Sequence, residues 1–355
     1  MIKIGIVGTG GIAQWHVTEF QKNNDSTVVA ACDVASDRLN TFCDQFNIKE
    51  RYNTIEELLD KADIDAIANT TPDSFHKDIS IKAIKKNKHV FCEKPLAENY
   101  QDAKKMCDAL KNKNLVNMVN FSYRNSSAYQ ELVKTVQSGK IGNIMHVDAN
   151  YYQSWLSSKY WGDWRTEDKW LWRLSTNHGS MGTLGDIGVH IFDFASFPIG
   201  SIKKLNARLK TFKSKGEKIK DYTLDANDTF ISMVEFENGA LGTITSTRFA
   251  TGYSNRLKLK IFGDKGAVKI EFDDPLTEGS EFMITNDIDR KFSSKDDKLK
   301  WETIETPPTM NNFEKFIDSI KNNVSHEPNF QRGAEIQNIL DKCALSSNLN
   351  SWVDI

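Results

Sequence analysis

The sequence predicts an α/β protein with two domains: the first is built on a doubly wound parallel sheet, and the second on an antiparallel sheet. The chain has 355 residues, about twice the usual size of one domain. Strand-like and helix-like segments alternate over roughly the first 120 residues, as in βαβ units. Beyond about residue 140, apolar and polar residues alternate with the period of two that is typical of strands with one buried face.

The first domain is predicted element by element from this alternation. A capping box, Thr54 to Glu57, opens a short helix, and Asp73 can cap a helix that runs to about Lys86. The remaining elements follow from apolar spacing, with strands expected at Ile2–Val7, Val28–Asp33, Ile64–Asn69, His89–Cys92 and Leu115–Asn120 and helices at Gly11–Lys22, Ser36–Phe46 and Gln101–Lys111.

The second domain begins with an expected helix at Ser126–Ser138 and continues as an antiparallel sheet over about residues 140 to 305. Asn238-Gly239 is a strong hairpin signal, and Gly263 to Gly266 marks a second hairpin. Residues 286–300 are strongly charged and are expected to form an exposed loop. Helices are expected at Asn311–Lys321 and Gln331–Leu349.

Composition narrows the class of protein. Lysine and arginine number 46 against 48 acidic residues, so no basic excess directs the surface toward nucleic acid or an anionic membrane. No apolar run approaches the roughly 20 residues needed to span a bilayer, and the opening MIKIGIVG is too short for a signal peptide. Five scattered cysteines without a Cys/His cluster predict neither a disulfide framework nor a metal site. We expect a cytoplasmic protein.

A glycine-rich turn follows the first strand. Gly8, Gly10, Gly11, Ile12 and Ala13 form a G-x-G-x-x-A pattern between a strand and a helix, which is the context of a dinucleotide-binding fingerprint. Gly8 permits the tight turn, and Gly10 lets a pyrophosphate approach the helix N-terminus. The alternative is an ordinary glycine-rich turn.

Asp33 ends the second strand, where a carboxylate can accept the ribose hydroxyls of NAD and repel the 2′-phosphate of NADP. Arg38 lies one helical turn further on and is able to reach a phosphate. The pattern therefore favours NAD, with NADP as the alternative. Asp33 is also a candidate helix cap, and the two roles are compatible.

Two further motifs carry reactive side chains. Glu93-Lys94-Pro95 follows a strand, at the edge where open α/β sheets bind ligands, and the lysine charge can stabilise a substrate alkoxide. The alternative is a surface turn. Asp186 and His190 are at i and i+4 and share a face if helical, and histidine can accept a proton near neutral pH. Gly188 between them indicates close packing. The alternative is a core histidine beside a capping aspartate.

These motifs, in this order, resemble the glucose–fructose oxidoreductase / inositol dehydrogenase family (Gfo/Idh/MocA) over nearly the whole chain. Thr70 to His76 is similar to the family's T-P-x-x-x-H segment. Tyr123-Arg124 looks like the Y-R pair that opens the second domain, and Trp172-Arg173 has the position of the family's W-R pair.

The resemblance implies a Rossmann domain at 1–121 and an α/β domain at 122–355 with a large, mostly antiparallel open sheet, and it makes the C-terminal helices candidates to pack back on the first domain. It implies a cis Lys94–Pro95 bond, which proline makes feasible. The implied catalytic residues are Lys94, Asp186 and His190. The implied cofactor-binding residues are Gly8, Gly10, Gly11, Ile12, Asp33, Arg38, Thr70, Thr71, Pro72, His76, Glu93 and Lys94, and the implied substrate-binding residues are Tyr123, Arg124, Trp172, Arg173, Asp186 and His190.

The sequence departs from the family pattern at two places. Ser180-Met181-Gly182 stands where the family has a glycine triplet, and Asn120 stands where small residues are common. Both changes bear on the shape of the substrate pocket. Residues 151–172 are rich in Trp and Tyr, which suits the C–H faces of a sugar but equally suits core or interface packing.

The expected activity is therefore an NAD-dependent dehydrogenase that oxidises a secondary alcohol of a sugar or cyclic polyol. In the reaction implied by the resemblance, His190 takes the hydroxyl proton, Lys94 stabilises the alkoxide, and Asp186 orients the substrate or the base. One alternative is an NAD-dependent glycoside hydrolase that oxidises its substrate transiently, and another is a non-catalytic NAD-binding regulator. A sheet with helices on one side leaves a face to bury, so a homodimer or homotetramer is expected.

Overall fold

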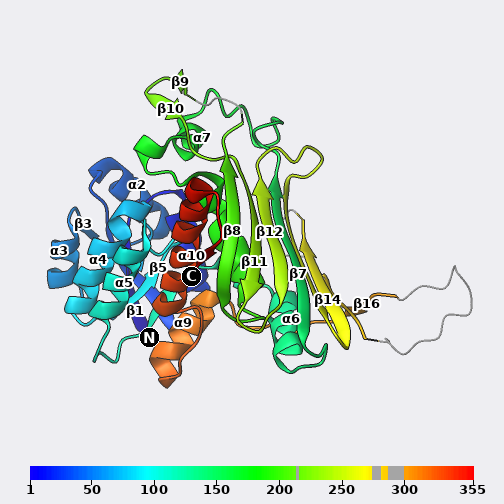
Figure 1. The fold of residues 1–355 in the computed structure, drawn as a ribbon. Helices are drawn as coiled ribbons and strands as arrows, with labels where there is room; N and C mark the ends of the chain where they lie inside the picture. The colour runs from blue at the N-terminus through cyan, green and yellow to red at the C-terminus, as the bar shows by residue number, and fades with distance from the viewer. Residues whose placement is uncertain (213–215, 274–280, 287–299) are drawn as a thin grey trace, which may run out of the picture. The chain divides into compact units, whose positions relative to one another are not determined.

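Two units make up the computed structural model of the chain, which describes residues 1–212, 216–273, 281–286 and 300–355 (Figure 1). The first unit contains Met1–Ser122 and Met310–Asn338, and the second contains Tyr123–Thr309 and Ile339–Ile355. Most of the charged loop expected at 286–300 lies outside the described residues.

The first unit is a six-stranded parallel sheet in the order β3-β2-β1-β4-β5-β6, the order of a doubly wound dinucleotide-binding sheet. The predicted sheet is confirmed. The short polar strand β3 was not expected, because its three residues carry no apolar pattern. The strands are β1 (Ile2–Val7), β2 (Ser26–Cys32), β3 (Glu50–Tyr52), β4 (Ala66–Asn69), β5 (His89–Cys92) and β6 (Asn117–Val119), and the helices between them are α1 (Gly11–Lys22), α2 (Ser36–Phe46), α3 (Ile55–Lys61), α4 (Asp73–Lys85) and α5 (Tyr100–Ala109).

Two expected helix caps have different outcomes. The Thr54 side chain accepts a hydrogen bond from the backbone N–H of Glu57, so it caps α3 as predicted. The expectation that Asp73 caps α4 is wrong, because Pro72 is the N-cap and Asp73 is the first helical residue. The carboxylate of Asp73 still lies in the first turn, where the helix dipole favours a negative charge.

The C-terminal part of the chain supplies helices to both units. Helix α9 (Asn312–Asn322) belongs to the first unit, where Phe313, Phe316 and Ile317 join the core of the parallel sheet. The Phe313 ring stacks on Phe91 with 4.8 Å between centroids. Residues 310–338 therefore group with the first unit. The resemblance placed them in the second domain but also made the C-terminal helices candidates to pack back on the first. Helix α10 (Phe330–Leu349) follows.

The second unit is built on a nine-stranded sheet in the order β16-β15-β14-β13-β7-β12-β11-β8-β17. The described pairs are antiparallel apart from β7 with β12, which is parallel, so the expected mostly antiparallel sheet is confirmed. Both predicted hairpins are present, β11 to β12 and β13 to β14. The strands are β7 (Ile144–Gln153), β8 (Ile202–Lys210), β11 (Thr229–Phe236), β12 (Leu241–Thr247), β13 (Asn255–Gly263), β14 (Gly266–Phe272), β15 (Glu281–Thr285), β16 (Glu302–Ile304) and β17 (Val353–Asp354); β9 (Glu217–Ile219) and β10 (Tyr222–Leu224) pair separately.

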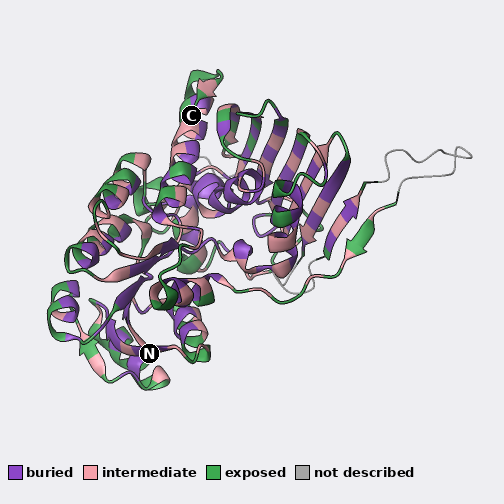
Figure 2. Cartoon of the chain, turned by 90° about the horizontal axis from the view of Figure 1, so that it is seen from below, coloured by how far each residue is buried: buried purple, intermediate pink, exposed green. Residues whose placement is uncertain are grey.

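Helices cover one face of this large sheet. Helix α6 (Ser127–Gln137) packs on β14 and β15, and α8 (Val189–Ser196) packs on β7, β12 and β13. Figure 2 shows the resulting bands of buried and less buried residues across the strands. Leu257, Leu259 and Ile261 are fully buried, as their period of two predicted. Short helical segments occupy Ser122–Asn125, Asp168–Leu171 (α7), Trp172–Leu174 and Thr176–His178.

The structure bears on two further expectations. None of the described helices has the length and apolarity required to traverse a bilayer. The five cysteines are free thiols, and within the described ranges no group of three or more His, Cys, Asp or Glu side chains is arranged to hold a metal ion.

The packing of α9 generates a prediction. Replacing Phe313, which is 1% exposed, by Ala should lower the free energy of unfolding by about 3–5 kcal/mol because it leaves a cavity among aromatic rings. Urea titration followed by circular dichroism measures this. The control Val324→Ala removes a residue that is 43% exposed and should change stability by less than about 0.5 kcal/mol. Equal effects of the two substitutions would contradict the assignment of α9 to the core of the first unit.

Candidate active site

The glycine turn after β1 has the geometry that the fingerprint requires. Gly8 has a φ of +89°, and a Cβ there would lie 2.9 Å from the backbone oxygen of Thr70, so a side chain is excluded by both conformation and contact. A Cβ on Gly10 or Gly11 would meet nothing within 4 Å. Gly10 is the N-cap of α1 and has no side chain to occupy the helix end, so the space above this N-terminus suits a pyrophosphate.

A second loop, Thr70 to Pro72, follows β4 and is hydrogen-bonded to the glycine turn. The Thr70 hydroxyl donates to the carbonyl oxygen of Gly8 over 2.6 Å. The Thr71 hydroxyl donates to Asn69 Oδ1 over 2.7 Å, and Pro72 is the N-cap of α4. The ends of β1 and β4 therefore present one continuous edge of backbone, the place where ligands of parallel sheets bind.

His76 is buried, and both nitrogens of its ring contact backbone carbonyl oxygens of neighbouring loops. Its side chain is fully buried, with Nδ1 2.8 Å from the carbonyl oxygen of Pro95 and Nε2 2.9 Å from that of Thr71. Burial opposes the charged ring, but its interactions with Cys92, with the carboxylate of Asp73 and with the carbonyl oxygen of Pro95 raise the pKa of His76 to about 10. Both ring nitrogens are engaged, so His76 connects the loops after β4 and β5, whereas the resemblance implied direct contact with the cofactor.

Asp33 is buried after β2, and its carboxylate already has several donors. Oδ2 accepts from the backbone N–H and the hydroxyl of Thr9, each over 2.8 Å, and the Arg38 guanidinium forms an ion pair with it. Burial alone would raise the pKa of Asp33, but the bonds from Arg38, Ala35 and Thr9 lower it to about 2. The Arg38 side chain is half exposed, whereas the Asp33 carboxylate is buried, and its lowered pKa keeps Asp33 negatively charged near neutral pH.

The Glu93-Lys94-Pro95 turn follows β5, and the buried carboxylate of Glu93 stabilises it through hydrogen bonds. Glu93 Oε1 lies 2.7 Å from Nε2 of His16 and accepts a 2.7 Å bond from the Asn120 amide. Glu93 Oε2 accepts the backbone N–H of Lys94. The Lys94–Pro95 bond is cis, as the resemblance implied. Glu93 therefore positions the turn that carries Lys94, and Asn120, one of the departures from the family pattern, is part of that support.

In the second unit, Asp186 lies in a π-helical turn, Leu184–Gly188, that runs directly into α8. The predicted α-helical spacing was therefore wrong for this turn, and π-turns of this kind often occur at functional sites. Close packing at Gly188 is confirmed, because a Cβ there would lie 3.1 Å from the Phe230 ring.

Two arginines hold the Asp186 carboxylate. Nη2 of Arg248 donates to Oδ2 of Asp186 over 2.8 Å, and Nε of Arg173 lies 3.7 Å from the same oxygen. Arg248 is fully buried, its guanidinium lies 4.8 Å from the centre of the Trp155 ring, and its Nη1 donates to the carbonyl oxygen of Arg173. Sequence reasoning missed Arg248; its only signal is a lone basic residue directly after a predicted strand.

His190 lies one helical turn further on in α8 and is buried against Tyr123. The two rings meet edge to face with 4.7 Å between centroids. The hydroxyl of Tyr123 is hydrogen-bonded to that of Tyr151. Burial raises the pKa of Tyr151, and the negative charge of Asp186 raises it further, so Tyr151 keeps its proton. Tyr151 is a site residue that the sequence motifs did not identify.

Arg124, predicted to bind substrate, is instead a structural residue. Its guanidinium makes a two-pronged bond to Asp193 at 2.7 and 2.6 Å, and both side chains are almost completely buried. The guanidinium also lies over the ring of Phe197 at 3.6 Å. This pair fixes the start of the second unit to α8.

The tryptophan-rich segment divides between packing and surface. Trp155 and Trp164 are buried in a core cluster, and Trp161 and Trp170 stack against each other with 5.8 Å between centroids. Trp172 is 37% exposed, with the guanidinium of Arg173 4.6 Å from its ring centre. Trp155 and Trp164 are therefore core residues, whereas Trp172 and Tyr160, which is 59% exposed, stay available to a ligand.

The structure thus gathers the predicted residues into two groups, one in each unit. In the first unit the loops after β1, β2, β4 and β5, together with the first turns of α1 and α2, carry Gly8, Gly10, Gly11, Ile12, Asp33, Arg38, Thr70, Thr71, Pro72, Glu93 and Lys94. In the second unit Tyr123, Trp172, Arg173, Asp186 and His190 belong to the group that also contains Tyr151 and Arg248.

The fold and these side chains define a class, a dinucleotide-binding oxidoreductase with a separate substrate-binding unit. Two family models match the chain: "Oxidoreductase family, NAD-binding Rossmann fold" over residues 2–121, and "GFO/IDH/MocA C-terminal domain" over residues 129–269. The chain belongs to the Gfo/Idh/MocA family of NAD-binding oxidoreductases, which confirms the resemblance drawn from the motifs.

Relatives within the family are sugar and polyol dehydrogenases. Levoglucosan dehydrogenase of Pseudarthrobacter phenanthrenivorans is 26% identical over 347 residues, which cover 88% of this chain and 85% of that protein. Myo-inositol 2-dehydrogenase of Thermotoga maritima is 26% identical over 273 residues, covering 75% and 74%. The structure of levoglucosan dehydrogenase in complex with NADH and levoglucosan matches with a TM-score of 0.86 and 26% identity, covering 100% of this chain and 99% of that one.

The buried Glu93 carboxylate generates a pH prediction. Burial opposes its charge, but the bonds from His16 and Asn120 lower the pKa of Glu93 from 4.5 to about 2. A carboxylate whose pKa is lower in the folded state adds stability above pH 4.5 and loses it as the pH falls toward 2. Urea unfolding at a series of pH values should therefore show a steep fall in this window, and Glu93→Gln should make the fall shallower. Glu98→Gln, at an exposed position, is the control. Equal slopes for wild type and Glu93→Gln would contradict this account of the turn.

Proposed function

We propose that this protein is an NAD-dependent dehydrogenase that oxidises a secondary alcohol of a sugar or cyclic polyol. One observation carries the proposal: a carboxylate fixed by a buried arginine, Asp186, lies in the helical segment that also contains His190, whose ring packs against the ring of Tyr123. Such a group binds a hydroxyl and takes its proton. The dehydrogenase activities of the relatives point the same way.

The residues of the first unit fit a dinucleotide. The open space over Gly10 and Gly11 suits the pyrophosphate, and the carboxylate of Asp33 suits the ribose hydroxyls. Thr70, Thr71 and Pro72 form a further wall. NAD, when bound, supplies the acceptor for the hydride that leaves the carbinol carbon.

The chain's own residues divide the remaining work. His190 accepts the proton of the reacting hydroxyl, and the ammonium group of Lys94 stabilises the negative charge that develops on that oxygen. Asp186, fixed by Arg248 and Arg173, accepts a hydrogen bond from a neighbouring hydroxyl and so orients the ring. Tyr151, which keeps its proton, holds the hydroxyl of Tyr123 in place beside His190.

We further propose a homodimer or homotetramer that forms through the helix-free face of the large sheet. Ile231, Met233 and Leu241 are 55%, 48% and 53% exposed, and adjacent strands bring them to one surface. Apolar side chains at this density usually mark an interface. A monomeric mass by light scattering at micromolar concentration would refute this.

Free cysteines and the use of NAD support a cytoplasmic location.

The catalytic proposal predicts reduction of NAD by at least one sugar or polyol. Absorbance at the reduced-nicotinamide band is followed with NAD and a panel of inositols, aldoses and anhydrosugars. Lys94→Ala, His190→Asn and Asp186→Asn should each lower kcat about 100-fold or more, because each removes a group that stabilises the transition state. Glu98→Gln, an exposed position, should leave the rate unchanged.

The pattern of failure separates the alternatives. In one outcome the wild-type protein forms no NADH with any sugar of the panel and yet releases bound NAD when it is denatured. This result would favour the glycoside hydrolase or the non-catalytic regulator over the dehydrogenase. Full activity in Lys94→Ala or His190→Asn would contradict the assigned roles while leaving the activity intact.

The Asp33–Arg38 pair predicts the choice of cofactor. Asp33→Ala should raise KM for NAD about tenfold, because hydrogen bonds to a charged carboxylate are lost, and should lower KM for NADP. Arg38→Ala should leave KM for NAD within about threefold, since the half-exposed arginine faces the carboxylate rather than the ribose. Steady-state kinetics with both cofactors measures this. A wild type that prefers NADP, or an Asp33→Ala variant with an unchanged preference, would contradict the assignment.

A further inference from the structure

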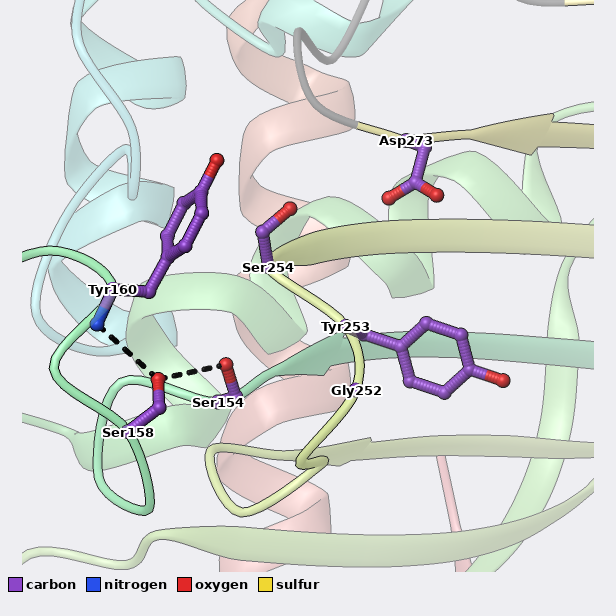
Figure 3. A pocket seen from close by; sticks show the side chains of 7 residues that line it. All are labelled: Ser154, Ser158, Tyr160, Gly252, Tyr253, Ser254 and Asp273. Atoms are coloured by element: carbon purple, nitrogen blue, oxygen red, sulfur yellow. Dashed lines mark hydrogen bonds between the residues drawn. The ribbon is translucent and has the colours of Figure 1, made fainter.

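A pocket of about 660 Å³ lies in the second unit and is not used by any residue of the proposed catalytic group. Its volume is within the range of sites that hold small ligands, which is about 300–1,000 Å³. Figure 3 shows it between the loop after β7 and the loop before β13, with the end of β14 beside them. It is lined by Ser154, Ser158, Tyr160, Gly252, Tyr253, Ser254 and Asp273.

Most of the side chains that line the pocket carry a hydroxyl group. Three serines and two tyrosines supply five of them, and Asp273 supplies a carboxylate. Ser158 Oγ is held in place by Ser154 Oγ at 3.2 Å and by the backbone N–H of Tyr160 at 3.3 Å. A hydroxyl has one donor and two acceptor positions, so these groups keep capacity for a ligand. The hydroxyl of Thr251 donates to Ser157 and joins the two loops.

This chemistry selects one class of occupant. None of the seven lining residues is basic, and Asp273 would repel a phosphate or carboxylate. Among the described lining residues Asp273 is the single acidic one, which is too few for a metal ion. An apolar ligand would leave the hydroxyl groups without partners. The remaining class is a neutral molecule with many hydroxyl groups, for which Tyr160 and Tyr253, 59% and 36% exposed, offer aromatic surface.

The pocket is connected to the proposed catalytic group through a short series of contacts. Ser154 and Ser254 are the chain neighbours of Gln153 and Asn255, which pair in register and share a 2.9 Å bond between their side chains. Gln153 Oε1 accepts from the Trp155 indole over 3.1 Å.

The series ends at the carboxylate of the proposed site. The ring of Trp155 lies under the guanidinium of Arg248, and Arg248 bonds to Asp186. The pocket and the Asp186 group therefore belong to one network of contacts within the second unit.

From this arrangement we infer that the pocket is a subsite for a second sugar ring. The inference rests on the proposed function and narrows it: the substrate is a glycoside or disaccharide, oxidised on the ring next to Asp186 and His190 and held by its other ring among Ser154, Ser254, Tyr160 and Asp273. Binding of the second ring raises kcat/KM for the disaccharide above that for the matching monosaccharide.

The test compares matched sugars. NADH formation is measured with glucose against cellobiose and maltose, and with galactose against lactose. At least one disaccharide should exceed its monosaccharide in kcat/KM by about tenfold, the value of one hydrogen bond to a charged group. Asp273→Asn and Tyr160→Ala should remove that advantage and keep monosaccharide kcat/KM within about twofold. Glu237→Gln, exposed in the turn between β11 and β12, is the matched control.

Each outcome decides the inference. Monosaccharides that are equal or better in every pair overturn it, as do variants that reduce activity on both members of a pair equally. If none of the sugars reduces NAD, the proposed function fails, and saturation-transfer NMR with the same disaccharides tests the pocket alone. A transfer signal that Asp273→Asn and Tyr160→Ala abolish supports a sugar subsite, whereas no signal, or one that both variants retain, overturns it.

Discussion

The ion pair between Asp186 and Arg248 is the interaction on which the proposed active site depends. Arg248 is fully buried, so its charge has lost hydration that only close partners replace. It finds them in Asp186, in the Arg173 carbonyl oxygen and in the face of Trp155. The carboxylate is thereby fixed from the end of β12 as well as by its own helical turn. Both the orientation that we propose for the substrate and the series of contacts that leads to the pocket depend on this one pair.

The first unit uses the same principle for a different purpose. Its loops are connected to one another before any cofactor binds, since Thr70 bonds to the glycine turn and His76 bonds to the backbone of Thr71 and Pro95. The Glu93 carboxylate then stabilises the turn that carries Lys94 by accepting hydrogen bonds from the Lys94 backbone and the Asn120 amide. Because loops of this kind are already ordered, the entropy cost of ordering them on binding is smaller.

Much of the fold and part of the site could be predicted from the sequence, and the boundary between the two has physical reasons. Strands such as Ile2–Val7 and the hairpin at Asn238-Gly239 were predictable because local spacing and turn chemistry determine them. The resemblance made the C-terminal helices candidates to pack back on the first domain, but local spacing alone did not determine the burial of the Phe313 face, because that burial depends on a sheet much earlier in the chain.

The site residues divide in the same way. Glycines and strand-end residues were identified through motifs, but motifs do not distinguish a ligand contact from a supporting contact. Arg124 and His76 are polar residues of the family pattern that the structure shows to be satisfied internally, by Asp193 and by backbone carbonyl groups. Arg248 carries no motif at all, and only the tertiary structure brings it to Asp186.

The measurement that tests the central claim most directly is the mass of the reduced cofactor formed from a deuterated substrate. The sugar that the panel identifies is labelled with deuterium at the oxidised carbinol carbon and incubated with NAD, and the released NADH is examined by mass spectrometry. The account predicts one deuterium on each NADH released, together with a slower turnover than with unlabelled sugar. Unlabelled NADH, or a consumed sugar without released NADH, would contradict it.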